Sequence, residues 1–349
     1  MTGQDQKDAK RIAVVIPCYR SAATVGELIT RIGPEVDRIY CVNDASDDNL
    51  SEVLAAVAQS DARVTNLTHA VNGGVGAATV TGYRAAIEGG AQIIVKLDSD
   101  GQMDPRLILA VVAPIRRGEA DYVKGNRFFD IESVREMPKL RLIGNAGLSF
   151  MSKLSSGHWH LFDPNNGFTA IHADVASVLP LEKLHKRYFF ESDLLFRLGT
   201  VKAAVRDVPM EAIYGDETSN LSEMQVLFQF PLFHARNFFK RIAYNYFLRD
   251  FSAASLSLIV GVMLLVFGVI FGISAWVDGA RAGVPATAGT VMLSAFPTLV
   301  GIQLLLSFLG HDVSMSPRKP IHLDLAAVRV LSGVKLPADK VSVRETSSG

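Results

Sequence analysis

Residues 93–105 read Ile-Ile-Val-Lys-Leu-Asp-Ser-Asp-Gly-Gln-Met-Asp-Pro, an apolar run of strand length that ends abruptly in acidic and amide residues. A buried strand would deliver Asp98, Asp100 and Gln102 to its C-terminal end, where ligands bind in open α/β sheets. If the strand stays regular, both carboxylates point to one side and offer oxygen ligands suited to Mg²⁺ or Mn²⁺. The alternative is an Asx-rich turn without a ligand.

The residues on either side of this stretch alternate between strand and helix patterns. Apolar, β-rich runs at 12–17, 38–42 and 64–68 are each followed by a helical pattern, at 24–32, 50–59 and up to residue 88. Such alternation predicts an α/β fold, with a parallel, Rossmann-like sheet and helices on both faces.

Polar residues and glycines gather where these strands end. Residues 43–48, Asn-Asp-Ala-Ser-Asp-Asp, would lie at a ligand site, although the same residue types also cap helices. Residues 72–78, Asn-Gly-Gly-Val-Gly-Ala-Ala, follow the third strand and lack the G-x-G-x-x-G spacing of a dinucleotide fingerprint. A tight turn that brings the backbone close to a ligand is the better interpretation.

The composition excludes some partners. The chain has 349 residues, with 35 basic against 35 acidic side chains, so its charge gives no reason to expect nucleic acid as a partner.

Its two cysteines, Cys18 and Cys41, fall on the first two strands and fit a reducing compartment. Residues 1–10 are polar and lack the apolar core of a signal peptide.

Two long apolar stretches near the C-terminus predict a membrane anchor. Residues 252–277 and 282–310 contain no charged side chain, and each is long enough to cross a hydrocarbon core of about 30 Å. Residues 224–250 mix aromatic with basic residues, as an interfacial segment would. Basic residues flank both ends of the pair, so both ends should be cytoplasmic and the hairpin tip should face outward; they are Lys240, Arg241, Arg249, Arg318 and Lys319.

Four motifs together resemble the inverting family 2 glycosyltransferases, which have a GT-A fold. They are Val-Ile-Pro-Cys-Tyr at 15–19, Val-Asn-Asp-Ala-Ser at 42–46, the glycine loop at 72–78, and Leu-Asp-Ser-Asp-Gly-Gln at 97–102. Further stretches at 125–128, 137–141, 163–168 and 190–197 are similar to the polyprenyl-phosphate sugar synthases, the group of dolichyl-phosphate mannose synthase and bacterial polyprenyl-phosphate glucosyltransferases. The resemblance covers residues 12 to 221.

The resemblance implies a division into five parts. Residues 1–10 would be a polar tail, 11–221 a GT-A nucleotide-diphospho-sugar transferase domain, 222–250 an amphipathic juxtamembrane segment, 251–311 a two-helix transmembrane hairpin and 312–349 a cytoplasmic tail. The resemblance also suggests a homo-oligomer, a tetramer.

By matching position, the resemblance assigns roles at the donor site. Pro17 and Tyr19 would line the nucleoside pocket and Asp44 would bond the base or ribose, while the divalent ion on the donor diphosphate, Mg²⁺ or Mn²⁺, would be held by Asp98, Asp100 and Gln102. The chemistry supports this independently, because a cation on the diphosphate stabilises the charge that develops on the leaving group.

The resemblance places Arg127 and Arg141 at the acceptor phosphate, which a guanidinium fork suits; the alternative is that both are solvated cations. Asp193 stands where the family carries an acidic residue near the anomeric carbon. It would act as general base toward a hydroxyl, whereas a phosphate acceptor needs none. Glu191 and Asp193 could instead be exposed charges in the first turn of a helix.

Some positions depart from the family pattern. No cation follows Val208-Pro209, where an Arg and a Ser-Lys pair are common, Thr169 stands where an Arg is frequent, and Arg20-Ser21 replaces Asn-Glu. These departures leave open which cation besides the metal covers the donor diphosphate.

The expected function is a membrane-anchored, metal-dependent inverting glycosyltransferase. It would move a sugar from a UDP- or GDP-sugar onto undecaprenyl or dolichyl phosphate, as a multi-pass protein of the inner (plasma) membrane with a cytoplasmic catalytic domain. Transfer to a hydroxyl of a lipid-linked saccharide, with Asp193 as base, is the alternative enzymatic interpretation. A non-catalytic membrane scaffold is disfavoured by the intact Asp98, Asp100 and Gln102.

Overall fold

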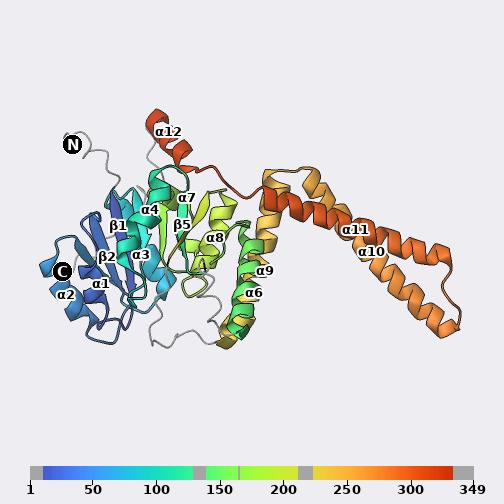
Figure 1. Cartoon of the computed structure of the whole chain (residues 1–349), viewed down its shortest axis with the longest axis horizontal. Coiled ribbons are helices and arrows are strands. Elements are labelled where there is room, and N and C mark those ends of the chain that lie inside the picture. Colours follow the sequence, from blue (N-terminus) through green and yellow to red (C-terminus); the bar gives the residue numbers. More distant parts are fainter. Residues whose placement is uncertain (1–10, 129–138, 164–165, 211–222, 333–349) are drawn as a thin grey trace, which may run out of the picture. The chain divides into compact units, whose positions relative to one another are not determined.

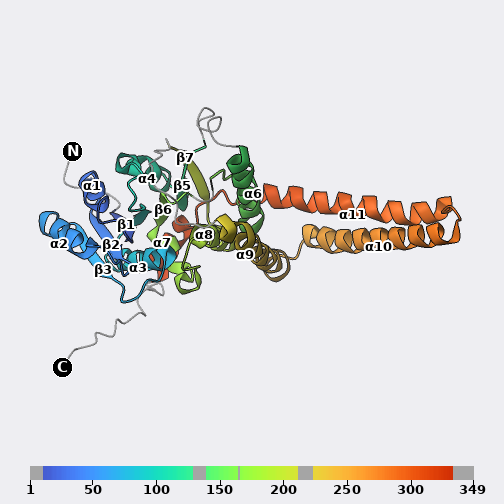
Figure 2. The ribbon, with the colours of Figure 1, turned by 90° about the horizontal axis from the view of Figure 1, so that it is seen from below.

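The computed structural model describes residues 11–128, 139–163, 166–210 and 223–332. The predictions for residues 1–10, 211–221 and 333–349 lie outside these ranges. The chain divides into two compact units, Met1–Asn237 with Pro317–Gly349, and Phe238–Ser316. The first unit holds the sheet and the second holds two long helices (Figures 1 and 2). The C-terminal residues thus return to the unit that contains the N-terminal strands.

The first unit is built on a seven-stranded sheet in the order β3-β2-β1-β4-β6-β5-β7. The strands β1, β2, β3 and β4 are parallel, so their carboxyl ends meet at one edge of the sheet. This arrangement confirms the expected α/β fold. The strands are β1 (Ile12–Cys18), β2 (Arg38–Asn43), β3 (Val64–Thr68), β4 (Ile93–Lys96), β5 (Tyr122–Asn126), β6 (Thr169–His172) and β7 (Val205–Pro209).

The sheet as a whole is mixed, although the four strands on which the prediction of a parallel sheet rested are parallel. Strand β6 runs antiparallel to both of its neighbours, β4 and β5, while β7 is parallel to β5. The four residues of β6 are all buried, so their hydrophobic pattern carries no information about direction. Thr169, the first residue of β6, pairs with Lys96, the last residue of β4, so β6 enters the sheet at the edge where β4 ends.

Helices cover both faces of the sheet, because successive side chains of a strand point to opposite faces. Ile12, Val14 and Ile16 of β1 pack with helices α1, α2 and α4, whereas Ala13 and Val15 pack with α3, α7 and α8. Figure 2 shows the strands between α1 and α4 on one side and α3, α7 and α8 on the other. The helices are α1 (Val25–Thr30), α2 (Leu50–Ser60), α3 (Val75–Glu88), α4 (Ile108–Arg116), α7 (Ala173–Val178) and α8 (Phe190–Thr200), with short 3₁₀ turns at Pro105–Leu107 and Leu181–Lys183.

Two further helices, α6 (Lys139–Ser156) and α9 (Glu223–Ala243), follow in the chain. Within the first unit they are joined by a buried hydrogen bond of 2.8 Å between Ser155 Oγ and His234 Nδ1.

The C-terminal helix α12 (His322–Ser332) is anchored on the first unit by one buried carboxylate. Asp121, at the start of β5, is fully buried and accepts the backbone N–H groups of Ile321 and His322 at 2.8 and 2.9 Å. It also pairs with His322 Nδ1 at 2.7 Å and accepts the backbone N–H of Ala204 at 2.8 Å. The His322 ring stacks on His172, with centroids 4.3 Å apart. The end of the described chain is therefore a specifically bonded part of the first unit.

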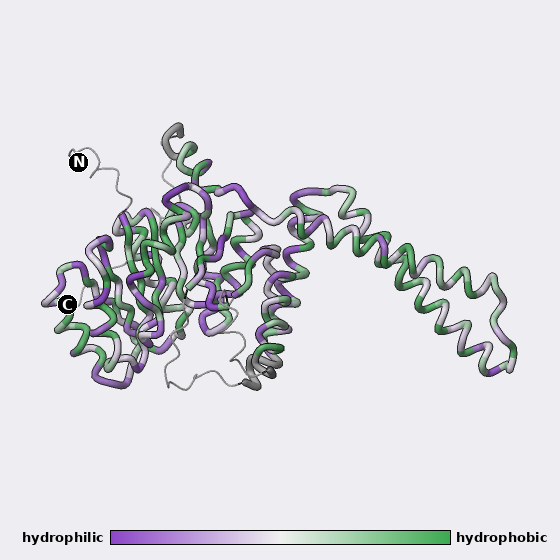
Figure 3. Tube along the Cα trace, in the orientation of Figure 1, coloured by the Kyte–Doolittle hydropathy of each residue, from purple (hydrophilic) through white to green (hydrophobic). Residues whose placement is uncertain are grey.

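The second unit contains the two apolar helices expected from the sequence, α10 (Ala253–Ala282) and α11 (Ala288–Ser314). Both are long and apolar enough to cross a membrane, and Figure 3 shows their nearly continuous hydrophobic colouring. Glycines allow the helices to approach closely: a Cβ on Gly301 would lie 2.7 Å from the backbone nitrogen of Leu265. Ser294 Oγ also donates across the pair to the carbonyl of Gly268 at 3.0 Å.

A buried ion pair closes the base of this hairpin. The guanidinium of Arg241 binds Asp312 of α11 through two hydrogen bonds, of 2.7 and 2.9 Å, and Tyr246 donates its hydroxyl to the same carboxylate at 2.6 Å. Tyr246 lies in a π-helical segment, Tyr244–Arg249, between α9 and α10. Arg241, which the sequence places among the basic residues that flank the hairpin, is thus a buried cation paired within the second unit.

Candidate active site

A pocket of about 450 Å³ lies where β1, β2 and β4 end. Its size falls within the range of small-molecule sites, roughly 300–1,000 Å³. Pro17 and Tyr19, predicted to contact a nucleoside, lie in its wall together with Asp44, Asp98 and Asp100. The structure therefore brings together five residues that the sequence picked out from three separate strand ends.

The two aspartates of the Asp-Ser-Asp motif lie in a turn and not on a regular strand, because β4 ends at Lys96. The backbone N–H of Gln102 donates to Asp100 Oδ1 at 3.0 Å, a contact typical of an Asx turn. Both carboxylates nevertheless line the pocket, so the turn and the ligand-facing position coexist. The Gln102 side chain is not among the lining residues, and its role as a metal ligand stays a prediction.

Asp98 and Asp100 fit a cation that is shared with a substrate. Among the residues that the structure describes, no three His, Cys, Asp or Glu side chains gather closely enough to hold a metal ion by themselves. Mg²⁺ is commonly bound by one or two carboxylates, with substrate phosphates and water as the other ligands. The carboxylates of Asp98 and Asp100 therefore match a metal site that is completed by substrate phosphates better than a site in which the protein supplies every ligand.

A buried lysine lies behind this turn. Lys96 is 1% exposed, and its Nζ donates to Asp98 Oδ1 at 2.6 Å and to Glu191 Oε1 at 3.0 Å. Burial alone would lower the pKa of Lys96, but the two carboxylates reverse this effect and raise the pKa above its usual value. Lys96 is therefore a permanent cation that fixes one carboxylate of the motif.

A glycine lets the backbone approach the same carboxylate. A Cβ on Gly167 would lie 2.0 Å from Asp98 Oδ2, so no side chain fits at this position. Gly167 also accepts a long hydrogen bond of 3.4 Å from Lys96 Nζ through its carbonyl. Gly167 thus packs directly against the Asp98 turn.

Asp44 holds the glycine loop and does not cap helix α2. Its carboxylate accepts the backbone N–H groups of Gly73 and Gly74 at 2.8 and 2.7 Å and pairs with His69 Nδ1 at 2.7 Å. Asp48 instead accepts the N–H of Leu50, at the start of α2. The acidic cluster at 43–48 therefore reaches the pocket through Asp44 and bonds the start of α2 through Asp48, while a contact of Asp44 with a ligand stays a prediction.

The first turn of helix α8 holds two buried carboxylates with different surroundings. Glu191 lines the pocket, whereas Asp193 is not among the lining residues. Asp193 Oδ2 accepts the backbone N–H of His185 at 3.1 Å and also binds the Arg197 guanidinium, and its Oδ1 accepts Asn237 Nδ2 at 3.1 Å. Neither carboxylate is the exposed charge of the alternative interpretation. The contacts of Asp193 are those of a group that positions its neighbours, and its role as a base stays a prediction.

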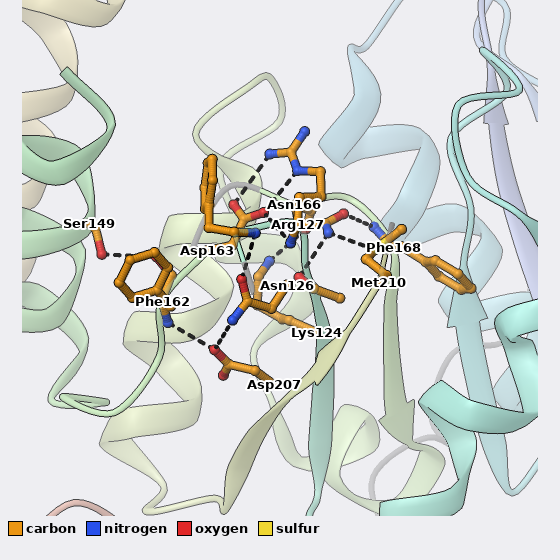
Figure 4. A network of polar contacts seen from close by, with 12 residues as sticks. Lys124, Asn126, Arg127, Ser149, Phe162, Asp163, Asn166, Phe168, Asp207 and Met210 are labelled. Atoms are coloured by element: carbon orange, nitrogen blue, oxygen red, sulfur yellow. Dashed lines mark hydrogen bonds and ion pairs between the residues drawn. The ribbon is translucent and has the colours of Figure 1, made fainter. Parts of the chain in front are cut away.

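Arg127 lies in a polar network at the end of β5 (Figure 4). Its Nε donates to Asp163 Oδ2 at 2.8 Å, and its side chain is 34% exposed against 2% for that of Asp163. In the same network Asp207 accepts from the side chain of Asn126 and from the backbone N–H of Phe162. Arg127 is therefore partly exposed and held in place by a buried carboxylate. It does not line the pocket, and its predicted contact with an acceptor phosphate is untested.

A second buried lysine, Lys124, supports this network. Its Nζ donates to the carbonyl of Asn166 at 2.7 Å, and Asn166 in turn donates to the carbonyl of Gly125 at 2.8 Å (Figure 4). Lys124 is 1% exposed, and burial lowers its pKa to about 8. Asp163 and Asn166 are thus bonded to the end of β5, which lies far from them in the sequence.

The other predicted phosphate ligand, Arg141, lies on helix α6, and its side chain is outside the part of the chain that the structure describes. Its role stays a prediction.

The sequence matches the model of the glycosyl transferase family 2 over residues 13–179. It is also 30% identical over 238 residues to the UDP-N-acetylglucosamine–dolichyl-phosphate N-acetylglucosaminyltransferase of Methanococcus voltae, a match that spans 64% of this chain and 94% of the relative. This chain belongs to glycosyl transferase family 2. The glycosyltransferase is also 27% identical over 205 residues to the undecaprenyl-phosphate mannosyltransferase of Micrococcus luteus, across 57% of this chain and 82% of that one.

Solved structures share the fold of this glycosyltransferase. The glucosyl-3-phosphoglycerate synthase of Mycobacterium tuberculosis, in complex with Mn²⁺, UDP-glucose and phosphoglyceric acid, matches with a TM-score of 0.50 and 19% identity. The match covers 69% of this chain and 84% of that chain. At this identity the comparison supports the GT-A fold.

Sequence reasoning did not assign a role to three charged residues of this glycosyltransferase site. Lys96 carried a signal, because a cation inside an otherwise apolar strand must be paired when it is buried. Glu191 and Asp193 share the first turn of a helix, and spacing along a helix cannot tell which of the two faces a pocket. Arg187 lines the pocket from the segment before α8, and no motif pointed to it.

Proposed function

We propose that this glycosyltransferase moves a sugar from a nucleotide-sugar onto a polyprenyl phosphate, with inversion at the anomeric carbon and with a divalent cation on the donor diphosphate. The single observation that carries the proposal is the pocket itself. It joins the wall formed by Pro17, Tyr19 and Asp44 to the carboxylates of Asp98 and Asp100. Both relatives described above are named for transfer to a polyprenyl phosphate.

The chemistry is a single displacement. An oxygen of the acceptor phosphate forms a bond to the anomeric carbon, while the bond from that carbon to the donor diphosphate breaks and the nucleoside diphosphate leaves with the electron pair. A divalent cation, held by Asp98 and Asp100, would neutralise the charge that grows on the leaving group. Lys96 orients Asp98 for this role through its 2.6 Å contact. The phosphate is already anionic near neutral pH, so no residue has to remove a proton from it.

The location follows from the apolar helices. Because α10 and α11 are long and apolar enough to span a bilayer, they would hold the enzyme where a polyprenyl phosphate is dissolved. Arg249 before the pair and Arg318 and Lys319 after it favour a cytoplasmic face for the catalytic unit.

The test is product identification. The purified full chain would be incubated with Mg²⁺ or Mn²⁺, undecaprenyl phosphate and a panel of UDP- and GDP-sugars, and the lipid fraction analysed by mass spectrometry. We expect one donor to give a sugar-phosphate lipid, and Asp100→Asn to lower its formation by about 100-fold or more, the scale of losing a preorganised charge-stabilising contact. No product with any donor, or full activity of Asp100→Asn at saturating metal, would refute the proposal.

Transfer to a hydroxyl remains the second candidate, because Glu191 offers a carboxylate inside the pocket. That carboxylate is already held by Lys96 Nζ at 3.0 Å, which favours the phosphate acceptor. A hydroxyl acceptor would need a base worth about 10² to 10⁴ in kcat. An acidic limb in the pH profile of kcat that disappears in Glu191→Gln or Asp193→Asn would establish the hydroxyl mechanism instead.

A further inference from the structure

The charged side chains that line the pocket are mostly negative, so they provide little positive charge to bind an anionic nucleotide-sugar. The lining contains four carboxylates and one cation: Asp44, Asp98, Asp100 and Glu191 against Arg187. A nucleoside diphosphate adds further negative charge, and a single divalent ion does not balance the total. Residues 211–222, which follow β7 in the sequence, include no Lys or Arg.

Other cations near the pocket are already engaged. Lys96 is buried behind Asp98 and bonded to two carboxylates. Arg127 is paired with Asp163 and does not line the pocket. For the Arg187 guanidinium, by contrast, the described part of the chain offers neither a hydrogen bond nor an ion pair, and the residue is exposed.

The segment that carries Arg187 is fixed to the glycine loop. The carbonyl of Lys186 accepts the backbone N–H of Ala77 at 3.1 Å. Gly74 has a φ of +90°, and a Cβ there would lie 2.8 Å from Arg187 Cγ. Asp44 binds the other side of the same loop, at the N–H groups of Gly73 and Gly74. One tight turn therefore holds both Asp44 and Arg187 at the pocket.

The same segment is fixed from helix α8. Asp193 accepts the backbone N–H of His185, two residues before Arg187, at 3.1 Å. The N–H of Arg187 itself donates to His185 Nδ1 at 3.2 Å. The backbone at Arg187 is thus held on both sides, while its side chain is exposed and lines the pocket.

We propose that Arg187 binds the diphosphate of the nucleotide-sugar donor, as the protein cation that acts beside the metal. This inference rests on the proposed function. A guanidinium matches the paired oxygens of a phosphate and keeps its charge throughout the reaction. Its position against the glycine loop that Asp44 also binds assigns it to the donor and not to the acceptor phosphate.

The experiment measures binding of UDP and of GDP, each with MgCl₂, to the full chain in detergent by titration calorimetry. Arg187→Ala should weaken binding of the nucleotide that the parent binds by about 10- to 100-fold, the scale of lost charge-assisted hydrogen bonds. Arg187→Lys should recover part of the loss. Lys186→Ala is the matched control, since this neighbouring cation is exposed but does not line the pocket, and it should bind like the parent.

Steady-state kinetics then separate donor from acceptor. Arg187→Ala should raise the KM of the nucleotide-sugar and leave that of the polyprenyl phosphate unchanged. Three outcomes would overturn the assignment of Arg187 and leave the proposed function standing. They are unchanged nucleotide binding in Arg187→Ala, an equal loss in Lys186→Ala, and an effect confined to the acceptor KM. A parent protein that binds neither UDP nor GDP would overturn the proposed function, and this inference with it.

Discussion

Lys96 places a permanent positive charge behind the Asp98 turn. Its role in the site is to hold two carboxylates, those of Asp98 and Glu191. Both Asp98 and Glu191, the latter from helix α8, line the pocket. A buried ion pair contributes little net stability compared with an apolar replacement, but the loss of one partner leaves the other charge buried and unpaired. Lys96 therefore matters for the orientation of the site as much as for its stability.

We predict that Lys96→Met lowers both activity and stability. The free energy of unfolding should fall by about 3 kcal/mol, near the low end for a broken buried pair, because Asp98 is 30% exposed. Thermal unfolding of the full chain in detergent, together with turnover, provides the measurement. Lys183→Met is the control, because Lys183 is exposed. A Lys96→Met protein with the parent's stability and turnover would contradict this role.

Lys124 gives the stability of the protein a specific pH dependence. Burial lowers its pKa from 10.5 to about 8, so between these values the unfolded state binds one more proton than the folded state. The free energy of unfolding must therefore rise with pH across this window. The shift corresponds to a gain on the order of 3 kcal/mol, which is absent below about pH 8.

We predict that this gain disappears in Lys124→Met. The difference in unfolding free energy, parent minus variant, should increase between about pH 8 and about pH 10. Urea unfolding of both proteins in the same detergent checks the prediction, and other titrating groups cancel in the difference. A pH-independent difference would mean that Lys124 is charged to the same extent in both states.

At the scale of elements, helix α12 is attached through Asp121, which accepts three backbone N–H groups and pairs with His322. The surrounding contacts are apolar, from Ile321 and Leu325 to the core beside β5. The carboxylate of Asp121 is fully buried. If it were lost, water could not take its place as the acceptor for these backbone N–H groups.

We expect Asp121→Ala to release this segment. Loss of the acceptor should cost about 3 kcal/mol or more, because charged hydrogen bonds of this kind are worth about 1.5 to 3 kcal/mol each. Trypsin should then cut after Arg318 much faster than in the parent. Asp324→Ala, on the exposed face of the same helix, is the control. Equal cleavage of all three proteins would show that Asp121 does not hold the segment.

The elements differ in how far the sequence could predict them. Alternating patterns gave β1 to β4 with their helices, because each strand is bounded by polar turn residues. The direction of β6 could not be predicted, because a short strand that is buried on both faces has the same hydrophobic pattern in a parallel and in an antiparallel position. The attachment of α12 could not be predicted for another reason. Asp121 and His322 are 201 residues apart and belong to no local motif.

The site shows the same limit. Asp44, Asp98 and Asp100 were predictable because each follows a strand whose end must lie at the ligand edge. Arg187 was not, because its segment before α8 has no pattern that indicates which way it faces. Charge balance in the folded pocket is what singles it out.

At the scale of the whole molecule, the hairpin can be tested for membrane insertion with introduced cysteines. The native Cys18 and Cys41 are buried and should label poorly. We predict that Arg318→Cys reacts with a membrane-impermeant maleimide only from the cytoplasmic side. Ala286→Cys, between α10 and α11, should react only from the opposite side. Labelling of both positions from one side would contradict a spanning hairpin.

The return of the chain to its first unit constrains topology independently of any charge rule. Asn237 and Pro317 belong to one compact unit, and a folded unit cannot lie on both sides of a bilayer. The number of crossings between these two residues must therefore be even. The attachment of His322 to Asp121 thus acts as a parity condition: α10 and α11 either both traverse the membrane or neither does, and a single-pass arrangement is incompatible with the fold.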